Sequence, residues 1–419
     1  MSANNNEYEH QPVPVTARKS LFSVAIVWAG FPMVMVGAFV GAQIITSLGF
    51  RKGMLAILLG NLVLALYVAC LSALAARDGQ TFALSCQKIF GKIGAKVIAV
   101  FLAGLVVGWF AVQTGLAGHG LNTLLGLPLN WSIAIIGGVF TLLSIAGIKM
   151  LKPVSIISIT LFIITAVISI VLNFQHHHWH EMVNYQPTAG HSLALGIGIT
   201  MAISVFVDSG TLTADFTRWS KTPGQAVIAS LAAFPCANIL PMLAGGLVAA
   251  SGEAADGDFA HLLLPLGPVF GLFAALFFVI NCASVAMHGL YNAAAGWSAV
   301  IPLSFRQLVV ILGIIGTLLA LAGITNWLVN WLSLLGIVVP GIGGAMIGWI
   351  LAGQRRFTPL RLLLAWGFSV ICSSLCAHYA PQYSVAVISI VSAFLFAVVA
   401  LTVIPESVPT AKGDINGSL

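Results

Sequence analysis

The sequence predicts an all-α integral membrane protein with about twelve transmembrane helices, and three observations carry this prediction. Apolar runs of roughly 20 residues, the length that spans a bilayer, recur along almost the whole chain. Only 7% of the 419 residues are charged, whereas soluble domains carry about 25%. The basic residues lie at the ends of the apolar runs, so the net charge of +6 indicates membrane topology rather than nucleic-acid binding.

The apolar runs define twelve predicted spans. The first six are 21–48, 54–76, 95–121, 131–148, 154–172 and 193–215. The second six are 225–250, 266–295, 308–322, 327–352, 360–377 and 384–404. An even number of spans places both polar tails, 1–20 and 405–419, on the same side of the membrane. The positions of the basic residues predict that this side is the cytoplasm. The polar segment 79–91 is predicted to be a short helix or loop on the cytoplasmic surface.

The first and sixth spans each contain an interruption. Gly-Phe-Pro at 30–32 lies near the middle of the first span, where proline removes a backbone donor and clashes with the preceding turn. In the sixth span the apolar run meets Asp208, and a carboxylate inside a membrane span is costly and indicates a functional site. Gly210, between Ser209 and Thr211, is a position where a membrane helix can unwind around a protein-lined cavity.

Paired interruptions in corresponding positions of two halves are typical of inverted-repeat transporters. The sequence therefore predicts a site between two broken helices. The alternative is a continuous sixth helix whose Asp208 bonds to a neighbouring helix.

Two further spans carry polar groups at helical spacing. Trp109 and Gln113 lie one turn apart on the third span and would suit a planar, hydrogen-bonding ring. The alternative is a core tryptophan and an interhelical glutamine bond. On the eighth span, Asn281, Ser284 and His288 form one polar stripe. Asn281 is a candidate to bind the substrate, and Ser284 is a candidate to bind a cation. His288 could either form an interhelical hydrogen bond or relay a proton.

Several blocks of the chain resemble the bacterial cytosine permeases of the nucleobase:cation symporter-1 (purine/cytosine permease) family. They are PVPVTARKS before the first span, AILLGNL at 56–62, VVGWF at 106–110 and SGTLTADFTRWSK at 209–221. The resemblance implies a five-plus-five inverted repeat with two extra C-terminal helices. It divides the chain into a ten-helix transport core at 21–352 and two accessory helices at 353–404.

The resemblance also implies roles for individual residues. Phe206 corresponds to an aromatic residue that stacks on the base, and Trp109 and Gln113 correspond to residues that line the ring in one family member. Asn281 corresponds to an eighth-span asparagine, and Phe31 lies near a first-span aromatic position. For the cation, the resemblance implies backbone oxygens from Gly30 and Met33, with Asn281 beside them and a hydroxyl from Ser284.

The sequence departs from the cytosine permeases at four further positions. Val106 replaces a glutamine, Val34 an aromatic residue, Asp208 a serine and Val285 a threonine that completes the sodium site. Asp208 would favour an aminopyrimidine, a guanidine-like edge or a protonated ring. It could alternatively carry a coupling proton, as could His288.

The sequence thus predicts a secondary active importer in the bacterial inner membrane, with no enzymatic activity, no cofactor and no obligatory protein partner. Its partners are the lipid bilayer and a small heterocyclic substrate: cytosine, a purine, hydroxymethylpyrimidine, hydantoin or allantoin. Na⁺ or H⁺ would be the coupling ion. The histidines at 176–180 are interpreted as a solvated loop, so no metal is expected beyond sodium. A nutrient sensor or a membrane-embedded enzyme are the alternatives.

Overall fold

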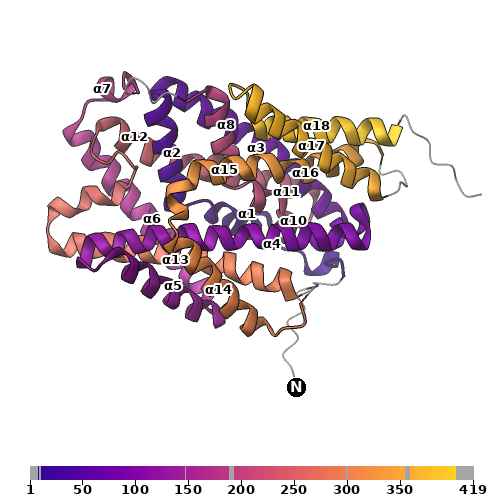
Figure 1. Cartoon of the computed structure of the whole chain (residues 1–419), viewed down its shortest axis with the longest axis horizontal. Helices are drawn as coiled ribbons and strands as arrows, with labels where there is room; N and C mark the ends of the chain where they lie inside the picture. Colours follow the sequence, from indigo (N-terminus) through magenta and orange to yellow (C-terminus); the bar gives the residue numbers. More distant parts are fainter. Residues whose placement is uncertain are drawn as a thin grey trace, which may run out of the picture.

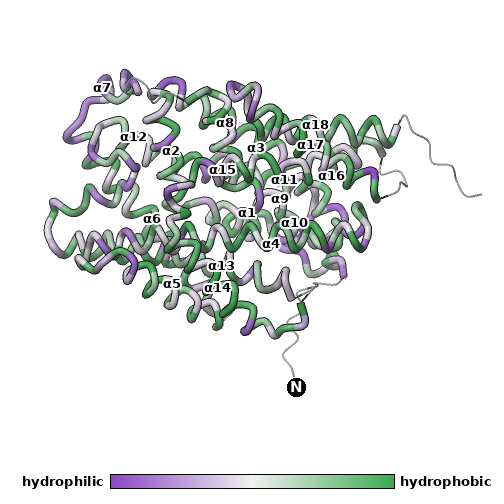
Figure 2. Tube along the Cα trace, in the orientation of Figure 1, coloured by the Kyte–Doolittle hydropathy of each residue, from purple (hydrophilic) through white to green (hydrophobic). Residues whose placement is uncertain are grey.

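The computed structural model describes residues 8, 11–146, 148–187, 193–298, 301–353 and 359–402. Within them the chain is helical almost throughout, and apolar residues run along the helices while hydrophilic ones gather at helix ends and connections (Figures 1 and 2). The predicted tail at 405–419 lies outside the described residues, as does most of the tail before residue 11.

Seventeen helical segments cover the predicted spans. They are α1 (Leu21–Gly30), α2 (Met35–Leu48), α3 (Phe50–Asp78), α4 (Phe82–Leu125), α5 (Leu129–Ile145), α6 (Ile148–His176), α8 (Leu195–Ser204), α9 (Val207–Thr211), α10 (Ala214–Thr217), α11 (Pro223–Leu231), α12 (Asn238–Ser251), α13 (Pro268–Ser298), α14 (Phe305–Leu321), α15 (Leu328–Val338), α16 (Pro340–Leu351), α17 (Pro359–Tyr379) and α18 (Val385–Thr402). The remaining described segments are short: η1 (Val15–Ala17), α7 (Trp179–Val183), η2 (Ala232–Ala237), η3 (Phe259–Leu266) and η4 (Ile324–Trp327).

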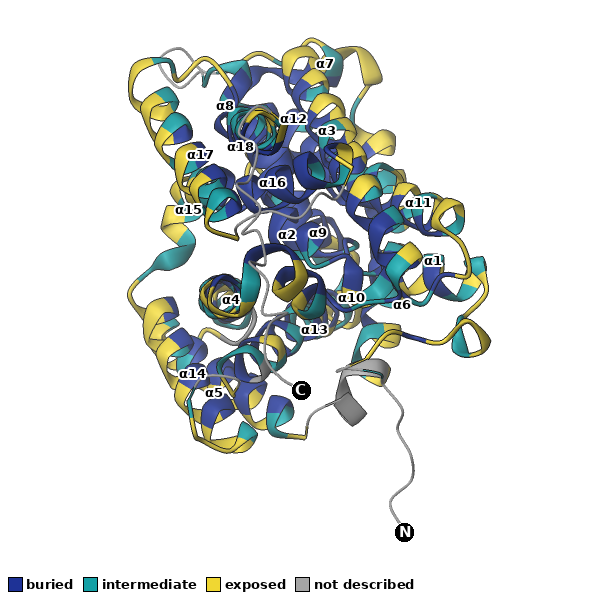
Figure 3. Cartoon of the chain, turned by 90° about the vertical axis from the view of Figure 1, so that its right-hand side faces the viewer, coloured by how far each residue is buried: buried dark blue, intermediate teal, exposed yellow. Residues whose placement is uncertain are grey.

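The described helices make this a multi-pass membrane protein. Eight helical stretches are long and apolar enough to cross a bilayer, and the bent pair α1–α2 adds a ninth. Three shorter apolar helices, α5, α8 and α14, lie where the fourth, sixth and ninth spans are predicted. Large apolar residues such as Trp131 of α5, Leu318 of α14 and Ile371 of α17 are exposed, where lipid would cover them. Figure 3 shows exposed residues along the outer sides of these helices.

The predicted interruption of the first span is confirmed. Helix α1 begins at a Ser20 cap, whose hydroxyl accepts from Ser23 N, and ends at Gly30. Extended backbone at Val34 precedes α2, and the two helices are bent by 60°. The turn follows from Pro32, which cannot donate a helical hydrogen bond.

The sixth span is also broken, but the unwound residues are not the predicted ones. Non-helical backbone occurs at Phe206 (φ −137°, ψ 14°) and again at Leu212, whereas Gly210 lies inside α9. A Cβ on Gly210 would come within 2.8 Å of Val68 on α3. The glycine is therefore required for close packing with α3, and the helix unwinds on either side of it.

One interruption was not predicted. The seventh span, expected as a continuous helix at 225–250, contains the irregular turn η2 between α11 and α12, with non-helical backbone at Phe234. Pro235 follows Phe234, and proline is a frequent cause of such kinks. Phe234 is fully buried against Trp28 of α1, so the interruption places an aromatic ring behind the broken first span.

The segment predicted as a short cytoplasmic helix is the first part of α4. The chain turns at Gly91, whose φ of +71° is accessible to glycine at little cost. The structure therefore continues this short helix into the third span.

Two sets of helices pack against one another. Helices α2, α3 and α8 to α12 form one set, and α4, α5, α6, α13 and α14 form the other. The sets meet where α13 contacts α2 and where α12 contacts α6. Helices α17 and α18 pack on each other and on α15 and α16, to one side (Figure 1).

Buried hydroxyl groups fix the broken sixth span to α3. Tyr67 Oη lies 2.7 Å from Thr211 Oγ1, and Ser72 Oγ lies 2.8 Å from Thr213 Oγ1. Ser230 of α11 donates to Ser72 as well. Because polar groups in an apolar interior are stable only when paired, these bonds hold the segment after Asp208 in one position.

Candidate functional site

A small cavity lies between the two broken spans, with a volume of about 40 Å³. Its lining comes from the first-span break and α2, from the sixth span, and from α4 and α13. The lining residues are Phe31, Val36, Val106, Trp109, Val205, Phe206, Asp208, Ser209, Leu212, Val285, His288, Gly289 and Asn292. The predicted residues Phe31, Trp109, Phe206, Asp208 and His288 thus share one cavity.

Asp208 is the charged residue of this cavity, and it is only 2% exposed. Trp109 Nε1 donates to its Oδ2 at 2.7 Å, and the backbone N of Ser209 donates to its Oδ1 at 2.7 Å. Within the described part of the chain, no lysine, arginine or histidine forms a salt bridge with it. The carboxylate therefore has hydrogen-bond donors but no countercharge, an arrangement that leaves it able to pair with a ligand.

The bond from Trp109 changes how that residue is interpreted. The sequence predicted a stacking surface, and the structure shows that the indole N–H also orients the Asp208 carboxylate. Gln113, one turn further along α4, is buried at 1% exposure and does not line the small cavity. Among the residues that the structure describes, its Nε2 has no hydrogen-bond partner, and its predicted contact with the substrate stays a prediction.

Aromatic rings surround the first-span break. Phe31 meets Phe206 edge to face, with centroids 5.7 Å apart, and meets the His288 ring at 6.3 Å. Trp28 stacks on Phe216 at 4.5 Å. Trp28 and Phe216 were not among the predicted site residues, because an aromatic residue in an apolar run looks like ordinary core.

Asn281 connects three elements rather than lining the small cavity. Its Oδ1 accepts from Met35 N at 2.8 Å, at the start of α2. Its Nδ2 donates to Met33 O at 3.3 Å and to Ser158 Oγ of α6 at 3.0 Å. The amide thus fixes the unwound first span against α6 and α13, and its predicted role as a direct substrate ligand stays untested.

Ser284 and His288 lie one turn apart on α13 and are joined by a hydrogen bond. His288 Nδ1 donates to the backbone oxygen of Ser284 at 2.7 Å, so Nδ1 carries a proton and the other ring nitrogen is the variable one. Ser284 Oγ lies 3.3 Å from Ser155 Oγ of α6. The contact between α13 and α6 is thus made by Ser284, whereas the hydrogen bond of His288 stays within α13. Both predicted roles of His288, the interhelical bond and the proton relay, stay predictions.

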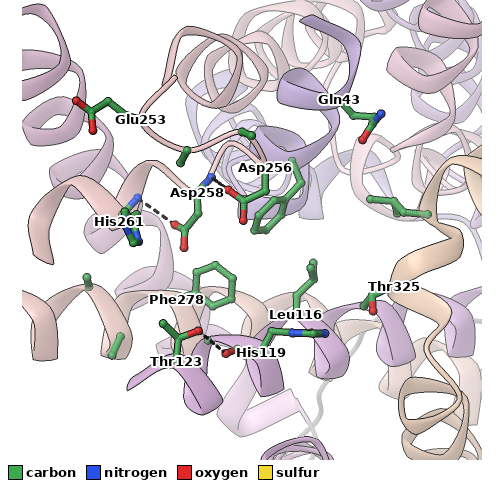
Figure 4. Close-up of a pocket in the computed structure, with 18 of the residues that line it drawn as sticks. Gln43, Leu116, His119, Thr123, Glu253, Asp256, Asp258, His261, Phe278 and Thr325 are labelled. Carbon is green, nitrogen blue, oxygen red and sulfur yellow. Dashed lines mark hydrogen bonds between the residues drawn. The ribbon is translucent and has the colours of Figure 1, made fainter. Parts of the chain in front are cut away.

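A second, larger cavity has a volume of about 780 Å³ (Figure 4). The same three helices lead from one to the other: α2 through Phe39, α4 through Leu116 and α13 through Phe278. We call this larger cavity the vestibule. It lies beside the loop after α12, which the sequence places on the non-cytoplasmic side.

The vestibule is acidic. Glu253, Asp256 and Asp258 lie among its lining residues, together with His119 and His261, and the lining contains no lysine or arginine. Figure 4 shows the two aspartates facing His119 across the cavity. A cleft lined by one sign of charge concentrates ions of the opposite sign, so the vestibule should favour cations and cationic solutes.

We expect Asp258→Asn to stabilise the protein at pH 8 and to have little effect at pH 4. Burial raises the pKa of Asp258 to about 7, and the nearby Asp256 carboxylate contributes to the rise. Between about pH 4 and 7 the folded state therefore holds a proton that the unfolded chain has released, so stability falls as pH rises through this window. Asparagine can still accept the hydrogen bond from Ala260 N, but it does not titrate, so it removes this pH dependence of stability.

Thermal unfolding of the detergent-purified wild type and variant at both pH values measures the effect. Glu253→Gln, at the exposed rim, is the matched control. If the melting temperature of Asp258→Asn followed the same pH dependence as that of the wild type, Asp258 would not be the source of that dependence.

Comparison with known proteins relates this geometry to characterised molecules. The chain matches the family model "Permease for cytosine/purines, uracil, thiamine, allantoin" over residues 12–364. It is 30% identical over 361 residues to the cytosine permease of Escherichia coli (strain K12), which covers 85% of this chain and 84% of that protein.

Solved structures share the fold. The inward-facing conformation of Mhp1 aligns with a TM-score of 0.79 at 17% identity, covering 96% of this chain and 94% of that one. Mhp1 in a closed conformation with bromovinylhydantoin bound gives 0.70 at 18% identity, covering 96% and 95%. A Na⁺-coupled sialic acid symporter gives 0.68 at 14% identity, covering 96% and 92%.

Proposed function

The chain belongs to the family of permeases for cytosine, purines, uracil, thiamine and allantoin, and from this membership we propose that it imports a nucleobase or related nitrogen heterocycle by cation symport. It is a transporter rather than an enzyme. The observation that carries the substrate proposal is the Asp208 carboxylate, buried without a countercharge between the two broken spans.

The hydrogen bonding of Asp208 defines the chemistry of the substrate. A carboxylate accepts at about four lone-pair sites. Trp109 Nε1 and Ser209 N each occupy one of them, and Ser209 Oγ makes a longer contact of 3.4 Å to Oδ1. The remaining acceptor capacity can be used by N–H groups of a ring. An aminopyrimidine edge, a guanidine-like edge or a protonated ring would satisfy the remaining acceptor sites, whereas a ring that presents only carbonyl oxygens would be repelled.

The small cavity must widen before it can hold a heterocyclic substrate. Its volume of about 40 Å³ is well below the roughly 300–1,000 Å³ typical of ligand pockets. Phe31 and Phe206, in edge-to-face contact across it, are the two side chains whose separation would admit a ring. Substrate would then lie between their rings with its polar edge toward Asp208.

Alternating access is the transport mode that this arrangement supports. The vestibule leads from one side toward the small cavity along α2, α4 and α13. In inverted-repeat transporters one set of helices rocks against the other around a midplane site. The accessory helices α17 and α18 line neither cavity among the described residues, which supports their separation from the core at 21–352.

The proposal includes an inner-membrane location with both termini in the cytoplasm, as the distribution of basic residues predicts. The coupling ion is Na⁺ or H⁺. No obligatory protein partner is required for uptake.

Reconstitution into proteoliposomes tests the function. We expect accumulation of at least one labelled ring, among cytosine, adenine, hydroxymethylpyrimidine, hydantoin and allantoin, above its external concentration when a Na⁺ or H⁺ gradient is imposed. Collapse of the gradient should abolish accumulation. Saturable binding without accumulation under any gradient would instead identify a sensor and overturn the proposal.

A further inference from the structure

Two exposed lysines come together where the segment before α1 meets the end of the sixth span. Lys19 N donates to Trp219 O at 2.7 Å, and Lys19 forms a parallel β-bridge with Ser220. Lys221 follows Ser220 in the chain, and both lysines are exposed. The backbone bridge therefore places two positive charges, far apart in the sequence, on one surface patch.

The ring of Trp219 holds the first of these charges. Lys19 Nζ is 4.6 Å from the ring centroid, within the distance at which a cation is attracted to an aromatic face. Tryptophan is also enriched at the level of the lipid headgroups, where its apolar ring and polar N–H suit the boundary. The lysine is thus fixed by its backbone and by its side chain, and it still remains exposed.

The patch has a net positive charge. Arg18 lies beside Lys19, and its guanidinium donates to the backbone oxygens of Ala76 and Ser220 rather than to a carboxylate. In the part of the chain that the structure describes, neither lysine takes part in a salt bridge. The two ammonium groups are therefore available to an anion from outside the protein.

Apolar side chains continue from the patch along two neighbouring helices. Helices α1 and α11 begin directly after the lysines, at the caps Ser20 and Thr222, and pack against each other (Figure 3). Exposed apolar residues follow on both helices; they are Phe22 and Ile26 of α1 and Ile228 and Leu231 of α11. The lysines thus lie where a lipid-covered surface gives way to the cytoplasmic headgroup region.

The combination of charge and apolar surface selects the class of ligand. Clusters of basic residues at the cytoplasmic ends of membrane helices attract anionic lipids. A zwitterionic lipid carries its own ammonium group, which the two lysines would repel. A free phosphate ion would use the lysines but not the apolar surface. An anionic phospholipid uses both.

We propose that Lys19 and Lys221 bind the headgroup of an anionic phospholipid of the cytoplasmic leaflet, whose acyl chains lie along the exposed faces of α1 and α11. The lipid fastens the start of the first span to the end of the sixth. Trp28 of α1 stacks on Phe216 of the sixth span at 4.5 Å, so the same two elements also meet beside the substrate cavity. The inference concerns a second ligand and does not depend on the proposed transport.

Thermal unfolding of the delipidated, detergent-purified chain tests the site, because a ligand of the folded state raises the melting temperature by mass action. We expect dioleoylphosphatidylglycerol in mixed micelles to stabilise the wild type saturably, and dioleoylphosphatidylcholine to do so much less. Each lysine at an anionic lipid surface changes affinity about fivefold. Lys19→Gln combined with Lys221→Gln should therefore raise the half-saturating mole fraction of phosphatidylglycerol roughly 25-fold.

Arg51→Gln combined with Lys52→Gln is the matched control. Both residues are exposed at the start of α3, beyond the far end of the first span, and the change in net charge is the same. The control should titrate like the wild type. The bond from Lys19 N to Trp219 O belongs to the backbone, so the lysine variant keeps it and should melt like the wild type without lipid.

Three results would overturn the inference. One is an unchanged phosphatidylglycerol titration in the lysine double variant. Another is an equal shift in the control, which would identify general attraction to the protein's net charge. The third is equal stabilisation by inorganic phosphate, which would identify a free-anion site. Lys221→Gln alone, with an expected shift of about fivefold, provides the same test if the double variant does not fold.

Discussion

Replacing Asp208 by asparagine is expected to abolish concentrative uptake while the protein still folds. Asparagine has nearly the same shape, but it offers one acceptor oxygen and an NH₂ donor where the carboxylate offers two oxygens. Trp109 Nε1 and Ser209 N bond to different oxygens of Asp208, so one of them would face a donor. Hydrogen bonds to charged groups contribute about 1.5–3 kcal/mol each, which predicts a loss of affinity of roughly 10- to 150-fold.

Uptake and substrate affinity of the variant in proteoliposomes and detergent measure this effect. Asp215→Asn is the matched control, because Asp215 is a second aspartate of the sixth span and accepts from Phe82 N at the start of α4. It lines neither cavity, and asparagine can also cap a helix, so its substrate affinity should be unchanged. Wild-type accumulation by Asp208→Asn would remove Asp208 from the mechanism.

The second large effect is expected for Asn281→Leu, which should destabilise the protein and stop transport. Leucine removes the partner of Met35 N, Met33 O and Ser158 Oγ together. A buried donor or acceptor left unpaired costs about 1–3 kcal/mol, so we expect a loss of about 2–4 kcal/mol in the free energy of unfolding. The first-span break would no longer be fixed to α6 and α13.

Thermal unfolding and uptake of Asn281→Leu measure the two consequences. Ser158→Ala removes only one of the three partners, so it should cost about a third of that stability and leave transport measurable. If Asn281→Leu matched Ser158→Ala in both readouts, the connecting role of Asn281 would be wrong.

The positions of the long apolar helices could be predicted from the sequence because a membrane span is a local property. About 20 apolar residues must be contiguous to cross a bilayer, and polar connections separate them. The broken first span was also predictable, since Pro32 acts on its own turn. The exact unwound residues of the sixth span were not, because Gly210 is constrained by Val68, a residue far away in the sequence.

The contacts within the site depend on tertiary packing, so most of them could not be predicted from the sequence. Trp109 and Asp208 were each predicted as site residues, but the hydrogen bond between them joins positions 99 residues apart. Ser155 and Ser158 carried a weak signal, namely two hydroxyls at i and i+3 in an otherwise apolar span. That spacing places them on one helix face, yet it does not indicate which helix they face.

The most direct test of the account is whether Asp208 recognises the exocyclic amino group of an aminopyrimidine-type substrate. The measurement is the ligand-induced rise in melting temperature of the wild type and Asp208→Asn, with cytosine and hydroxymethylpyrimidine against uracil, which lacks the exocyclic amino group. We predict that the wild type is stabilised more by an amino-bearing ring than by uracil at equal concentration, and that the variant loses this preference. An identical preference in both proteins, or a wild-type preference for uracil, would contradict the account.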